Sequence, residues 1–173
     1  MITIFYGKES FCQPLQKISH YLNDPLISEN AKSFYQGKFR ASDDDRTFSI
    51  IDSLKTSNNK TRPFYIFLVS KMLPKADGAL SEALGLACKE FVEWNPNFLM
   101  SFLSSKNIDS AFIEDWADEI AGEFQIDCEP KEYPCIDSSF KNAANNCSAG
   151  NRKKLSSFYR LIRRSILEGR IIK

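Results

Sequence analysis

The chain has 173 residues, of which 43% are hydrophobic and 13% aromatic, and its formal net charge at pH 7 is +1. This length fits one domain, residues 1–173, and the apolar content excludes an intrinsically disordered chain. No apolar run approaches the ~18 residues of a membrane span. The opening MITIFYGK is too short and too soon charged for a signal peptide. The compartment stays open: the sequence as written fits a cytoplasmic protein, with a periplasmic or exported one as the alternative if Met1 replaces a removed signal peptide.

Apolar residues recur at helical spacing along nearly the whole chain, and Pro, Gly and capping residues mark the breaks. Residues 127–134 are predicted to be irregular. The predicted helices cover 9–23, 28–37, 42–56, 61–73, 77–94, 95–103, 107–124, 137–145 and 152–167.

The predicted fold class is all-α: an antiparallel helical-hairpin bundle or a short α-solenoid-like array of about seven to nine helices. The fourth to seventh helices form two consecutive hairpins of about 35 residues, near the length of a tetratricopeptide or HEAT unit. The signature residues of those repeats are not evident, so the bundle and the array both stay open.

The stretch DGALSEALGLACKEF, residues 77–91, carries alanines four residues apart at Ala79, Ala83 and Ala87, with Gly85 among them. These small residues widen the apolar face of the helix without adding bulk. We expect them to let a neighbouring helix approach closely, because a phosphate-binding groove would need a strand and a glycine-rich loop followed by Lys.

Charge is distributed unevenly along the chain. Residues 107–132 hold nine acidic side chains against Lys131 alone, whereas residues 151–173 hold eight Lys or Arg against one Glu. This asymmetry indicates either complementary surfaces within the chain or charged partners.

The acidic side chains of the seventh predicted helix fall into rows at i, i+4 spacing, where like charges repel. Three interpretations stay open: a solvated face, a docking face for a basic protein partner, or a face against the basic C-terminal helix. The candidate partner-binding residues are Glu114, Asp115, Asp118, Glu119 and Glu123.

The last predicted helix is amphipathic, with Arg160, Arg163 and Arg164 mostly off its apolar row. We expect it to dock on the acidic body of the same chain. Nucleic-acid binding is not expected, because the rest of the domain is acidic. Membrane-surface binding would leave the apolar row of the free protein uncovered.

Five cysteines are too few, and odd in number, for a disulfide scaffold. If the chain is exported, two of Cys128, Cys135 and Cys147 can pair. We expect no zinc site and no cofactor, because His20 is the only histidine and a fourth ligand is lacking.

The function that these patterns favour is a non-enzymatic protein-binding module, in the form of an immunity- or inhibitor-type protein that sequesters a basic partner through the acidic helix face. One alternative is a helical-repeat scaffold that binds a peptide. The other is a hydrolase that uses His20 or a carboxylate pair in a cleft.

Overall fold

The computed structural model describes residues 17–169, and in this range every regular element is helical. The fold-class prediction of an all-α bundle or array is confirmed. The elements in chain order are η1 (Ile18–Asn23), α1 (Glu29–Tyr35), α2 (Asp45–Asp52), η2 (Ser53–Lys55), α3 (Arg62–Met72), η3 (Leu73–Lys75), α4 (Gly78–Trp94), α5 (Pro96–Leu103), α6 (Phe112–Asp127), α7 (Glu132–Asn145) and α8 (Ala149–Leu167).

Local sequence signals account for several helix starts. Ser28 accepts a hydrogen bond from the Ala31 amide at the start of α1, and Asp44 accepts one from the Thr47 amide at the start of α2. Pro96 opens α5, where its missing N–H costs no helical hydrogen bond.

Several predicted boundaries are wrong. α6 begins at Phe112 rather than near residue 107, and α8 begins at Ala149 rather than at residue 152. The helix expected over 9–23 is a 3-10 segment, η1, in its described part, and residues 9–16 lie outside the described range. The helix expected over 137–145 begins earlier, at Glu132. Pro134 is tolerated there because the first four amides of a helix have no intrahelical acceptor.

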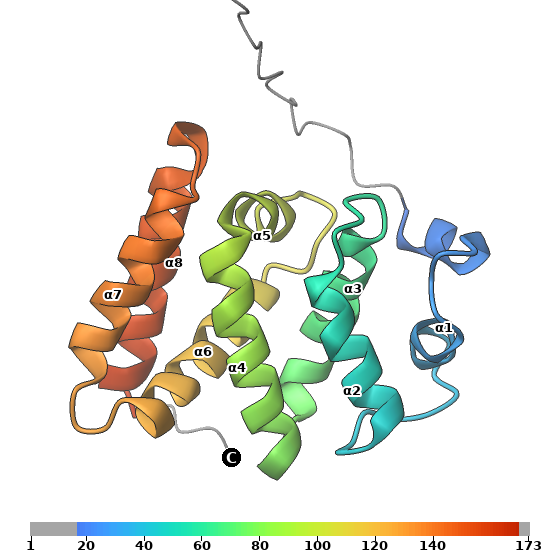
Figure 1. Ribbon diagram of the computed structural model, residues 1–173, viewed down its shortest axis with the longest axis horizontal. Coiled ribbons are helices and arrows are strands. Elements are labelled where there is room, and N and C mark those ends of the chain that lie inside the picture. The colour runs from blue at the N-terminus through green and yellow to red at the C-terminus, as the bar shows by residue number, and fades with distance from the viewer. Residues whose placement is uncertain (1–16, 170–173) are drawn as a thin grey trace, which may run out of the picture.

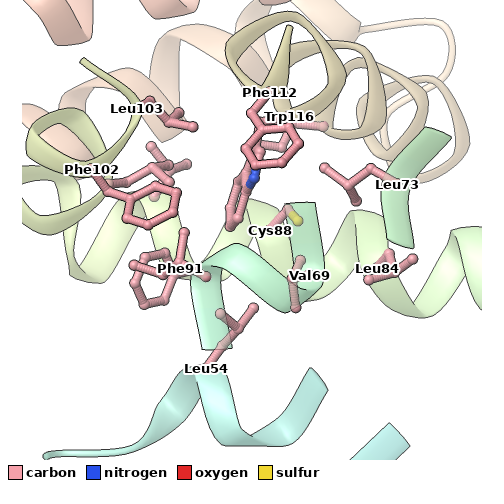
Figure 2. Packing of buried hydrophobic residues seen from close by; sticks show 14 of the residues in the cluster. Leu54, Val69, Leu73, Leu84, Cys88, Phe91, Phe102, Leu103, Phe112 and Trp116 are labelled. Carbon is pink, nitrogen blue, oxygen red and sulfur yellow. The ribbon is translucent and has the colours of Figure 1, made fainter. Parts of the chain in front are cut away.

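The core is built around α6, which has its most extensive contacts with α8 and α4 (Figure 1). Trp116 of α6 is fully buried, and its indole N–H donates to Ser70 Oγ of α3 at 2.7 Å. Figure 2 shows Trp116 and Phe112 beside Cys88 and Phe91 of α4. These contacts join elements far apart in the chain, so the helices do not pack only as successive hairpins.

Gly85 of α4 packs tightly against α6. A Cβ atom added at Gly85 would lie 3.1 Å from Glu123 Oε2 and 3.2 Å from Glu123 Cβ. The alanine row does not serve this approach as we expected. Ala79 is exposed, and Ala83 and Ala87 are only half-buried, so the small residue that is packed against α6 is Gly85 and not an alanine of this row.

Gly85→Val tests this contact. We expect it to lower the free energy of unfolding by about 2 kcal/mol, because the branched side chain overpacks the α4–α6 interface. Gly150→Val in α8 is the matched control, since nothing lies within 4 Å of a Cβ added there. Urea unfolding measures both, and equal midpoints would show that α4 and α6 have room to separate.

Candidate functional site

The acidic side chains of α6 that were predicted to bind a partner contact two different neighbouring helices, α8 and α4. Glu114 is exposed, and its Oε1 lies 3.3 Å from Arg164 Nη2 of α8. Asp118, half-buried, accepts a hydrogen bond from Ser165 Oγ of α8. These two carboxylates therefore face the basic C-terminal helix of the same chain.

Glu119 and Glu123 do not lie on an exposed face. Each is only 5% exposed, because α4 covers them. Ser81 Oγ of α4 donates to Glu119 Oε1 at 2.8 Å, and Lys89 Nζ lies 3.6 Å from Glu123 Oε1. The expectation that the five acidic residues form one continuous docking face is therefore wrong at these two positions.

Burial and mutual repulsion change the protonation of these carboxyl groups. Burial raises the pKa of Glu119 to about 7; the hydrogen bond from Ser81 opposes this rise, whereas Glu123 and Asp118 add to it. Burial and the charge of Asp127 raise the pKa of Glu123, and Lys89 lowers it. The Cys88 thiol, fully buried near both carboxyls, also has a raised pKa. The α4–α6 interface thus favours a protonated Glu119.

Asp115, the fifth acidic residue, is half-buried. Burial raises its pKa, and the charges of Asp118, Asp109 and Glu114 raise it further. The part of the acidic row that reaches solvent is thus limited to Glu114, Asp115 and Asp118.

The predicted basic residues of α8 have different environments. Arg163 forms an ion pair with Asp137 of α7, and Arg164 contacts both Glu114 and Glu168. Arg160 is exposed and donates to Ser157 Oγ at 2.8 Å. The arginines near the end of α8 are therefore neutralised within the chain, whereas Arg160 faces solvent.

Cys128 and Cys135 form a disulfide that joins the end of α6 to the first turn of α7, with their Cα atoms 6.4 Å apart. Cys147, the third candidate, is buried and free, as is Cys88. Cys12 lies outside the described residues.

The other candidate catalytic groups from the sequence lie in different environments. His20 is exposed on η1, and the Glu119–Glu123 pair is covered by α4. Within residues 17–169 no group of three or more His, Cys, Asp or Glu is placed to hold a metal ion. No helix in the same range is long and apolar enough to cross a membrane.

Sequence reasoning missed the outward side of α4. Leu86 is 46% exposed and Trp94 is 67% exposed, and these two residues are eight positions apart on one side of the helix. The signal was present in the sequence: the positions of Ala79, Ala83, Leu86, Ala87 and Trp94 share one helical side, which we call the apolar face of α4. Glu90, four residues from both Leu86 and Trp94, lies on the same side and is paired with Lys55.

No protein-family model, no curated protein and no solved structure compared with this chain matches it.

The raised pKa of Glu119 predicts a pH dependence. The folded state holds the Glu119 proton more tightly than the unfolded chain does, because the pKa is about 7 in the folded state and about 4.5 in the unfolded chain. The free energy of unfolding therefore falls as the pH rises from about 4.5 through about 7. Glu119→Gln should reduce this fall, to which Glu123 and Asp115 also contribute, and raise the free energy of unfolding at pH 8 by about 1–2 kcal/mol.

Urea unfolding at pH 5 and pH 8 measures the effect, with Glu82→Gln as the control, since Glu82 is exposed on the same α4 helix. A Glu119→Gln protein that is less stable than the wild type at pH 8 would show that the charged carboxylate is needed.

The disulfide predicts a second stability effect. The Cys128→Ser, Cys135→Ser double variant should lose about 2 kcal/mol, because the bond closes a short loop in the unfolded chain. Adding a dithiol reductant should lower the wild type to the level of this variant and leave the variant unchanged. Non-reducing peptide mapping that finds both thiols free would contradict the pairing.

Proposed function

We propose that the protein is a non-enzymatic protein-binding module whose partner docks on the apolar face of α4. The observation that carries this proposal is the exposure of Leu86 and Trp94 on one side of a well-anchored helix. Single exposed apolar residues are common on protein surfaces. Leu86 and Trp94 lie on one helix side with half-buried Ala87 beside them, and Glu90, which pairs with Lys55, lies between them. The two large side chains therefore offer a shallow apolar surface with a tryptophan at its end and one neutralised charge within it.

The surroundings of α4 support a preformed surface. α4 lies between α2 and α7 (Figure 1). Lys55 of η2 forms an ion pair with Glu90 at 3.4 Å, and Ser139 Oγ of α7 donates to Glu93 Oε1 at 2.6 Å. A partner would meet a fixed helix, which lowers the entropic cost of binding.

The acidic-face form of the hypothesis is not retained. Sequestering a basic partner needs a dense row of exposed carboxylates, and α4 covers Glu119 and Glu123 while α8 contacts Glu114 and Asp118. Tryptophan, in contrast, is among the residues that most often carry binding energy at protein interfaces.

Leu86→Ser and Trp94→Ser test the proposal. Each should leave the urea midpoint close to that of the wild type, because exposed side chains contribute little to stability. Each should weaken partner binding at least tenfold, or about 1.4 kcal/mol. Leu26→Ser is the matched control, since Leu26 is 64% exposed on another part of the surface.

The binding measurement is affinity capture from the source cells with quantitative mass spectrometry. Proteins captured by the wild type and by Leu26→Ser should be lost with both α4 variants. The same proteins captured by all four chains would place the partner surface elsewhere.

A further inference from the structure

The α7–α8 hairpin carries no acidic residue between Asp137 and Glu168. Across this stretch the charged side chains are all Lys or Arg. Arg163 and Arg164 have carboxylate partners, and Lys154 Nζ donates to Ser104 Oγ at 2.8 Å. Five exposed cations of this stretch have no ion pair with a carboxylate among the described residues. Lys154 is one of them and is held by Ser104; the other four are Lys141, Arg152, Lys153 and Arg160.

The contacts between the two helices bring these cations onto one surface. α7 and α8 run side by side, joined by a short connection (Figure 1). Asp137 pairs with Arg163, and Ser139 Oγ lies 2.8 Å from Tyr159 Oη, so Lys141 is level with the turn of α8 that holds Arg160. Lys153 lies two turns before Arg160 on the same side of α8.

We propose that this basic face of the hairpin, formed by Lys141, Arg152, Lys153 and Arg160, binds an acidic segment of a protein. The occupant follows from charge complementarity: a row of fixed cations without internal counter-charges attracts carboxylates. This surface is distinct from the apolar face of α4, so the proposal does not depend on the function proposed above.

Two other anionic partners fit the surface less well. Single-stranded nucleic acid is held by aromatic side chains on which its bases stack, and the aromatic residues of the hairpin beyond Tyr133 are at least half-buried: Phe140, Phe158 and Tyr159. A membrane surface presents a wide sheet of negative charge, which would also repel the acidic remainder of a chain whose net charge is only +1.

The experiment uses a fluorescent twelve-residue peptide of alternating Glu and Ser, titrated with the full chain at low and high salt. We expect salt-sensitive binding. The Lys141→Gln, Lys153→Gln, Arg160→Gln variant should bind the peptide at least tenfold more weakly. The control variant, Arg40→Gln, Lys60→Gln, Lys106→Gln, removes the same charge from other exposed positions and should change affinity less than twofold.

Equal losses in the two triple variants would overturn the proposal, because net charge alone would then explain the binding. The absence of peptide binding by the wild type would also overturn it. So would tighter, hairpin-dependent binding of an oligothymidylate or of vesicles containing phosphatidylserine. Trp94→Ser should leave the affinity for the acidic peptide unchanged. Failure of the basic-face proposal can therefore be distinguished from failure of the proposal for the apolar face of α4.

Discussion

The close approach of α4 to α6 at Gly85 is the constraint on which the rest of the structure depends. It lets α6 pack against α4 while its other side contacts α8. The approach has an electrostatic cost, since it removes Glu119 and Glu123 from water. Ser81 and Lys89 of α4 offset part of this cost, and protonation of Glu119 offsets more. The interface therefore couples packing at a glycine to the protonation of a carboxyl group.

This packing also decides which charges reach solvent. α4 covers two glutamates of α6 and other carboxylates of the row face α8, so most of the acidic row faces other helices and not solvent. The ion pair between Glu114 and Arg164 also neutralises part of the positive charge of α8. What remains on the outer side of the α7–α8 hairpin is positive. A net charge of +1 conceals this arrangement, because it sums the charges of the whole chain and carries no information on where each charge lies.

The helices were predictable from the sequence because their signals are local: apolar spacing, a capping residue such as Ser28, and a first-turn proline such as Pro96. The burial of Glu119 and Glu123 was not predictable from the sequence. Carboxylates at i, i+4 resemble a solvated face, and only the position of Gly85 on another helix shows that they are covered. The start of α7 was missed for a related reason, since Pro134 resembles a helix breaker unless its place in the first turn is known.

The two proposed surfaces differ in chemistry but share a rigid connection. Glu93, next to Trp94, accepts hydrogen bonds from Ser139 and Asn142 of α7, and its backbone carbonyl accepts one from Asn146. The apolar face of α4 is therefore held in a fixed relation to the hairpin that carries the basic face. In such an arrangement apolar contact supplies most of the affinity, whereas fixed charge speeds association and orients the partner.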